Sequence, residues 1–367
     1  MSLNCECHPV PDLRSIRCVT SVPPKIRRQT PSGADVGGTY LQSCLENWLK
    51  TGAMIVTLNR LEEIPHLQHI PSGVKCLPLC ADRALYTNRY GPSLGAMFEA
   101  AGDSDIVGIF NADTYLFDAS VFLELLEVEA KNSLIFARRI DVEVFGGALR
   151  TLNKSGVDAI FFDREQFKPM FEAPEVKIFQ MGVPWWDVLV PTVATFYGNV
   201  SCVAEPYIAH MDHQQAWDGK EYRRVGLLAR DAIMYQAEKM ADKSLAAREF
   251  LNLFSAFLER MKLEKDRKLL FLMNQFCWNW VWANTKIIQS PVKLESVLFK
   301  SSFKASIEER KFAKFRLDTL SSTSSFKDLI TTFKADFSRT HYLLFRHLEQ
   351  WIRYKVRPKY KKKNREQ

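Results

Sequence analysis

The run IVGIFNADTYLF, Ile106–Phe117, joins an apolar, strand-forming segment to two oxygen-bearing side chains. Its first five residues predict a buried strand, and Asn111-Ala112-Asp113 follows directly. Side chains at positions i and i+2 of a strand point the same way, so we expect Asn111 and Asp113 to converge at its carboxyl end. Open α/β sheets bind their ligands at that end. The alternative is a plain turn, because Asn and Asp favour turns in any protein.

Oxygen atoms of amide and carboxylate side chains are the ligands that Mg²⁺ or Mn²⁺ prefers, and a diphosphate can complete the coordination shell. Asn111 and Asp113 are therefore candidate ligands of a divalent cation.

Strand-like and helix-like runs alternate around this stretch. Strands are expected over 16–22, 53–58, 74–79, 106–110, 133–137 and 157–162, and helices over 39–49, 93–101 and 119–130. This alternation predicts an α/β fold with a mostly parallel sheet flanked by helices. From about residue 223 to 354 the pattern is helical. Neither G-x-G-x-x-G nor G-x-x-x-x-G-K-[ST] occurs, so the sequence lacks the Rossmann fingerprint and the P-loop.

Composition indicates a soluble globular protein of 367 residues, long enough for one large domain with an appendage or for two domains. The net charge of +8 resides mainly in residues 353–367, which hold eight Lys or Arg and one Glu. Such a tail can contact anionic lipid head groups or nucleic acid, or can simply be solvated. The eight cysteines lack paired C-x-x-C spacing and the N-terminus lacks an apolar leader. These features predict free thiols and a cytoplasmic protein.

Trp185-Trp186-Asp187 forms a second candidate group. Asp187 is expected near a helix start, where the neighbouring indoles would raise the pKa of its carboxyl and suit it to act as a general base. The alternative is a carboxylate that only caps the helix. Two adjacent Trp residues cannot share one helical face, so one of them is expected to line a cleft.

His210-x-x-His213 forms a third candidate group. On a helix the two imidazoles would share one face, whereas on a strand they would point opposite ways. With Asp113 they can complete a metal shell; the alternative is a pair of ordinary surface or interface histidines. Arg89 can reach a phosphate, as can Arg83, Arg138 or Arg139.

The order of these features resembles that of nucleotide-sugar-dependent glycosyltransferases of the GT-A fold, over about residues 16–220. The resemblance implies that the strand ending in Thr20 and Ser21 holds the nucleoside, and that Asn111-Ala112-Asp113 is an N-x-D variant of the D-x-D motif. It further implies that Asp187 is the catalytic base, the role that such a residue has in inverting members, and that His210 or His213 ligates the metal. Whether this chain inverts or retains the anomeric configuration stays open. Trp185 or Trp186 would then stack on a sugar.

The implied protein is a cytoplasmic transferase that moves a sugar from a UDP- or GDP-sugar to a hydroxyl of a polysaccharide or glycolipid, with Mn²⁺ or Mg²⁺. We expect a lead-in over 1–15, a catalytic domain over 16–220, a helical region over 221–352 that shapes the acceptor site, and a tail over 353–367 that contacts an anionic membrane. No specific nucleic acid is expected.

Two alternatives stay open. One is a non-catalytic binding protein of the same fold, whose basic tail contacts membrane or nucleic acid. The other is a sugar nucleotidyltransferase. Such an enzyme usually has a Gly-rich phosphate loop, but Ser21–Gln29 offers Lys25, Arg27 and Arg28 without a glycine.

Overall fold

The computed structural model describes residues 15–30, 32–79, 91–142, 149–152, 157–211, 218–261 and 266–289, with a few positions between 307 and 317. Its strands are β1 Ile16–Thr20, β2 Met54–Arg60, β3 Val74–Leu79, β4 Ile106–Phe110, β5 Thr114–Leu116, β6 Ser133–Val142, β7 Leu149–Leu152, β8 Ala159–Asp163, β9 Asn199–Met211 and β10 Thr285–Ile288. Its helices are α1 Gly37–Leu49, α2 Leu94–Ala100, α3 Ala119–Glu129, α4 Arg164–Phe171, α5 Pro174–Lys177, α6 Trp186–Tyr197, α7 Gly219–Met240, α8 Leu245–Met261 and α9 Asp266–Asn284, and a short 3₁₀ turn covers Ile64–His66.

The strands form one sheet in the order β10-β9-β6-β8-β4-β1-β2-β3, with β5 paired to β9 and β7 to β6. Along this order every pairing is parallel except those of β8, which runs antiparallel to both β4 and β6. The predicted α/β class, a mostly parallel sheet flanked by helices and followed by a helical region, is confirmed.

Both faces of the sheet are covered, as the nearly continuous apolar strands require. Two adjacent residues of β1, which point to opposite faces, show this. Cys18 packs in a core cluster with Trp48 of α1 and Phe122 of α3. Its neighbour Val19 packs in another cluster with Phe98 of α2 and residues of α4 and α6. Helices α1 and α3 thus cover one face, while α2, α4 and α6 cover the other.

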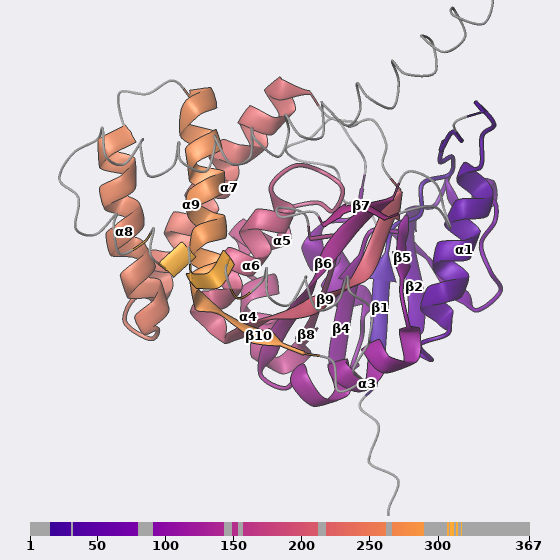
Figure 1. Ribbon diagram of the computed structural model, residues 1–367, viewed down its shortest axis with the longest axis horizontal. Helices are drawn as coiled ribbons and strands as arrows, with labels where there is room; N and C mark the ends of the chain where they lie inside the picture. The colour runs from indigo at the N-terminus through magenta and orange to yellow at the C-terminus, as the bar shows by residue number, and fades with distance from the viewer. Residues whose placement is uncertain are drawn as a thin grey trace, which may run out of the picture.

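The C-terminal helices extend this second layer. Helix α6 lies between the sheet and the group α7, α8 and α9 (Figure 1), and it contacts all three. The core cluster that contains Val19 continues through Phe250 of α8 and Trp280 of α9. The face of the sheet that Val19 occupies therefore shares one apolar core with the C-terminal helices. The expected domain boundary near residue 220 stays a prediction. Within the described residues, no helix is long and apolar enough to cross a membrane.

The sequence-based expectation of helix throughout the C-terminal region is wrong at β10, where Thr285–Ile288 adds a parallel strand beside β9. Its β-branched residues favour an extended chain once α9 has ended. Strand β9 was not predicted either. It is buried along most of its length, so it shows no polar–apolar alternation.

Several expectations fall on residues outside those that the structure describes. They are the lead-in before residue 15, Arg83, Arg89, the side chain of Arg138, His213, most of the expected helical region beyond residue 289, and the basic tail over 353–367.

Candidate functional site

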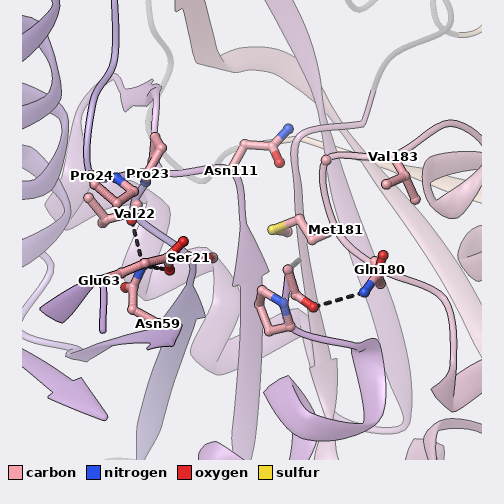
Figure 2. Close-up of a pocket in the computed structure, with 13 residues that line it drawn as sticks. Ser21, Val22, Pro23, Pro24, Asn59, Glu63, Asn111, Gln180, Met181 and Val183 are labelled. Atoms are coloured by element: carbon pink, nitrogen blue, oxygen red, sulfur yellow. Dashed lines mark hydrogen bonds between the residues drawn. The ribbon is translucent and has the colours of Figure 1, made fainter. Parts of the chain in front are cut away.

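A pocket of about 300 Å³ lies at the carboxyl ends of β1, β2 and β4 (Figure 2). Strand β2 lies on one side of β1 and β4 on the other, so the strand order reverses direction at β1. The pocket therefore lies at the topological switch point of the sheet. Ser21 follows β1 and Asn111 follows β4, and both line it. The structure thus brings together two side chains predicted from separate strands. The complete lining is Ser21, Val22, Pro23, Pro24, Asn59, Glu63, Gly91, Pro92, Asn111, Gln180, Met181, Gly182 and Val183.

Hydrogen bonds fix the walls of this pocket. The Asn59 amide donates to the carbonyl of Val22 at 2.6 Å, and the Val22 N–H donates to the hydroxyl of Thr57 at 3.0 Å. On the opposite wall the Gln180 amide donates to the carbonyl of Gly91 at 2.9 Å (Figure 2). The pocket is therefore formed before any ligand arrives.

Thr20, also predicted to contact a nucleoside, is fully buried. Its hydroxyl donates to the carbonyl of Phe110 at 2.7 Å and so ties the end of β1 to the end of β4. Thr20 holds the two strands together, while the next residue, Ser21, reaches the pocket. A direct contact of Thr20 with a nucleoside stays a prediction that this burial does not favour.

The segment from Asn111 to Thr114 is a turn. The N–H and the hydroxyl of Thr114 donate to the carbonyl of Asn111 at 3.1 and 2.6 Å. The expectation that strand alternation aims Asn111 and Asp113 at one point is therefore wrong, because the strand ends before them. The Asn111 amide donates to Asp158 at 2.8 Å, whereas Asp113 faces other partners.

Asp113 is held at both its side chain and its backbone. Its Oδ2 is ion-paired with Nη2 of Arg28 and lies 3.3 Å from Nε2 of His210. Its carbonyl accepts from the hydroxyl of Tyr40 at 2.7 Å, and that hydroxyl accepts from the N–H of Met211 at 2.9 Å. The sequence-based prediction joined Asp113 to His210 and missed the part played by Arg28.

Strand register explains why His210 reaches Asp113. Strand β9 lies between β6 and β5, and it pairs His210 with Asp141 on one side and Thr114 on the other. His210 is on a strand, so the shared helical face considered for the two histidines is not formed. Burial alone would lower the pKa of His210, but Asp113, Asp141 and Asp158 outweigh burial and raise it to about 10. The imidazole is thus protonated at neutral pH when no other cation is present.

The antiparallel direction of β8 adds a carboxylate that the sequence did not reveal. Residues that precede β8 lie at the carboxyl end of β4, where Asp158 accepts from Asn111 and from Nη1 of Arg139 at 2.7 Å. Nε of Arg139 lies 2.9 Å from Asp141. We call Arg28, Asp113, Arg139, Asp141, Asp158 and His210 the charged cluster.

Asp187 lies in the first turn of α6 and is partly exposed, near the helix start that the sequence predicted. Burial raises the pKa of its carboxyl to about 7; Asp158 adds to the rise and Arg139 opposes it. The residue at the start of the helix, Trp185, has a φ of 79°. A positive φ in a bulky residue is strained, and such strain gathers at functional sites.

Both indoles lie in the core, where Trp185 is 2% and Trp186 4% exposed. Nε1 of Trp185 donates to the carbonyl of Tyr222 at 3.0 Å. A side chain at Gly226 would bring its Cβ to 2.7 Å from that nitrogen, so only glycine allows the close approach. Neither Trp lines the pocket of Figure 2. Stacking of either indole on a sugar stays a prediction that this burial does not favour.

The cluster fits a divalent cation only in part. Among the residues that the structure describes, no three His, Cys, Asp or Glu side chains form a metal-binding group. Asp113 Oδ2 and His210 Nε2 are spaced as two ligands of one ion can be, and phosphate oxygens of a bound donor can supply further ligands. The Asn111 amide, in contrast, is turned to Asp158. The protein alone therefore offers two ligands, and Arg28 already contacts one of them.

The fold and the site define an α/β protein with a preformed pocket beside a charged cluster at the carboxyl edge of its sheet. No family model and no curated protein matches the sequence. Among solved structures, the chain is similar to the mannosyltransferase PcManGT from Pyrobaculum calidifontis in complex with GDP-Man and Mn²⁺, at 10% identity and a TM-score of 0.35, covering 82% of this chain and 87% of that one. It is also similar to 4-diphosphocytidyl-2C-methyl-D-erythritol synthase from Anaerococcus prevotii, at 13% identity and 0.34, covering 52% and 87%. A third is HddC from Yersinia pseudotuberculosis complexed with GMP-PN, at 11% identity and 0.28, covering 57% and 96%.

Proposed function

We propose that this chain is a glycosyltransferase that moves a sugar from a nucleotide-diphosphate donor to a hydroxyl acceptor. One observation carries the proposal. Asn111 lines the pocket and also bonds to Asp158 of the charged cluster, so a cavity with one ionisable lining residue, Glu63, adjoins a set of ionised groups. A nucleotide sugar has the same two parts, a nucleoside that is bound by shape and a diphosphate that is bound by charge.

Each part of the donor then has its place. The nucleoside, of UDP or GDP, occupies the pocket against Ser21 and the Pro23-Pro24 segment. The diphosphate extends toward Asp113 and His210, which would hold Mn²⁺ or Mg²⁺. Such an ion neutralises the charge that develops on the leaving diphosphate.

Asp187 is proposed as the general base. A carboxylate with a pKa near 7 can accept a proton from the attacking hydroxyl at neutral pH, and its partial exposure leaves it reachable by an acceptor. The polysaccharide or glycolipid acceptor, the helical region as its binding surface, the cytoplasmic location and the contact of the 353–367 tail with an anionic membrane are parts of the same proposal.

The test is donor turnover in the unmodified chain and in Asp113→Asn. Asn keeps the size of the side chain but removes the negative charge that faces Arg28 and His210, so turnover should fall by about 10²–10³-fold. Release of UDP or GDP from a panel of sugar donors measures it. Asp118→Asn is the matched control, because Asp118 is exposed and has a left-handed backbone that Asn tolerates. Full activity in Asp113→Asn contradicts the assigned role, and no binding of any donor by the unmodified chain favours the non-catalytic alternative.

A sugar nucleotidyltransferase is the second candidate, and the position of Arg28 favours it. The basic run after β1, which lacks glycine, nevertheless brings a guanidinium to Asp113. The two reactions differ in their products. A nucleotidyltransferase releases pyrophosphate from a nucleoside triphosphate and a sugar 1-phosphate, whereas the glycosyltransferase releases a nucleoside diphosphate from a nucleotide sugar. Assays for pyrophosphate and for nucleoside diphosphate on the same sample separate them.

A further inference from the structure

Arg28 is the least expected member of the charged cluster. Its side chain is only 8% exposed, yet it belongs to the loop that connects β1 to α1. Nη1 donates to the carbonyl of Arg27 at 2.9 Å and Nη2 contacts Asp113. Nε is buried and has no hydrogen-bond partner. A buried guanidinium N–H without a partner is costly, so this nitrogen points to a ligand that is bound at another stage.

The backbone that carries Arg28 is firmly held. The Asp35 carboxylate accepts from the N–H groups of Arg28 and Gly37, at 3.2 and 2.9 Å. A Cβ at Gly37 would lie 2.1 Å from the carbonyl oxygen of Ile26, so only glycine permits this packing. Any movement of the guanidinium therefore comes from rotation of its own side chain, while the loop stays in place.

The guanidinium and a divalent cation would compete for the same atom. Oδ2 of Asp113 contacts Nη2 of Arg28 and is also the oxygen that lies 3.3 Å from His210. A cation held between Asp113 and His210 would be close to the positive charge of Arg28, and at such distances like charges repel strongly. Both cations cannot occupy this position together.

We propose that Arg28 and a divalent cation alternate at Asp113, and that Arg28 transfers to the diphosphate of the donor when the cation binds. The inference rests on the proposed function. The loop that carries Arg28 also supplies Pro23 and Pro24 to the pocket, and Asn111, which lines the pocket, begins the turn that contains Asp113, the partner of Arg28. Nη2, freed from Asp113, and the unpartnered Nε form the fork with which arginine binds phosphate.

This exchange couples the two ligands. Without a nucleotide, Arg28 neutralises Asp113 and a cation binds weakly. With a nucleotide, the diphosphate gives Arg28 another partner and adds ligands to the cation. Each ligand should therefore strengthen the binding of the other by the same factor.

The experiment compares Arg28→Gln with Arg27→Gln, a neighbour of the same chemistry whose side chain is exposed. Paramagnetic resonance of free Mn²⁺ measures binding of the ion alone, and calorimetry measures UDP and GDP in the presence of Mn²⁺. Arg28→Gln should bind Mn²⁺ alone about tenfold more tightly and the nucleoside diphosphate about tenfold more weakly, within the usual range of coupling between sites. Arg27→Gln should match the unmodified chain in both titrations.

Two outcomes overturn the inference: Mn²⁺ affinity in Arg28→Gln that equals that of the unmodified chain, or nucleotide affinity that is unchanged. If thermal denaturation shows that Arg28→Gln does not fold, Arg28→Lys replaces it. Lysine keeps the charge, so it should still exclude Mn²⁺, but it lacks the fork and should bind the diphosphate less tightly. Failure of the unmodified chain to bind either nucleotide counts against the proposed function. The Mn²⁺ titration needs no nucleotide and still decides whether Arg28 excludes the cation.

Discussion

The pocket and the charged cluster are neighbours, and they are built in opposite ways. The pocket is an open cavity with little charge: of its thirteen lining residues, only Glu63 is ionisable. The cluster has charge and little space, because each of its aspartates is already paired with a cation. Asn111 connects the two, since it lines the pocket and donates a hydrogen bond to Asp158 of the cluster.

The two regions should therefore respond differently to substitution. At a lining residue such as Ser21, a change should alter binding and leave the free energy of unfolding almost unchanged. Asn59 and Gln180 are exceptions, because their hydrogen bonds hold the pocket walls. In the cluster, every buried charge depends on its partner. A change there should alter stability and chemistry together.

Asp187 offers the largest test of this contrast, because it borders the cluster and is proposed to act in the reaction. In Asp187→Asn we expect the turnover number to fall by about 10²–10⁴-fold with little change in nucleotide affinity. In the unmodified chain the base must be deprotonated, so turnover should rise with pH and level off above about 7, the raised pKa of Asp187. Initial rates between pH 5 and 9 should show that this rise is lost in the variant.

Asp163→Asn is the matched control, because Asp163 also lies at a helix start, where it accepts from the N–H of Gln166 at 3.1 Å. If Asp187 only caps α6, the two variants should behave alike. Stability provides a second readout. Because folding raises the pKa of Asp187, the folded chain binds the proton more tightly, and this group's contribution to stability is lost as pH rises from about 4 to 7. In Asp187→Asn this loss of stability should be absent. An equal decline of stability in the variant and in the unmodified chain would contradict the raised pKa of Asp187.

Asp158 tests the cluster itself. Its side chain is 7% exposed and accepts from both Asn111 and Arg139. Asp158→Ala would leave the largely buried guanidinium of Arg139 with one carboxylate fewer, so the free energy of unfolding should fall by about 3–5 kcal/mol. Chemical denaturation measures this. Asp231→Ala, in an exposed ion pair with Arg230, should lose less than about 1 kcal/mol. Equal losses at the two positions would mean that the cluster is not what holds this edge of the sheet.

The sequence predicted the fold as far as β4 well because the elements there are local. The expected strands at 74–79 and 106–110 match β3 and β4 residue for residue. In this part each strand is followed by an amphipathic helix or by a turn, and periodicity detects both. Strands β5, β7, β9 and β10 were missed because pairing along the sheet stabilises them, and distant partners leave no local pattern.

The site was predicted in part for the same reason. Asp113, Asn111 and Ser21 follow apolar strands, so their place at the edge of the sheet could be predicted. Arg28 and Asp158 could not, because their positions depend on a loop that folds back and on one strand that runs antiparallel. The turn and the functional site were treated as alternatives at Asn111-Ala112-Asp113. The structure forms a turn there, and that turn is what directs Asp113 toward Arg28 and His210.

The smallest expected effects concern two neighbouring hydroxyl groups: that of Thr20 stabilises the fold, and that of Ser21 lines the pocket. Thr20 is buried and donates to Phe110, so Thr20→Val should lower the free energy of unfolding by about 1 kcal/mol and leave nucleotide affinity unchanged. Ser21 lines the pocket, so Ser21→Val should leave stability within about 0.5 kcal/mol and weaken nucleotide binding by about 1 kcal/mol, which is severalfold. Denaturation and calorimetry on both variants give the four values. If Thr20→Val weakens nucleotide binding as much as Ser21→Val does, the hydroxyl of Thr20 also serves the ligand, and the division between the strand end and the pocket wall does not hold.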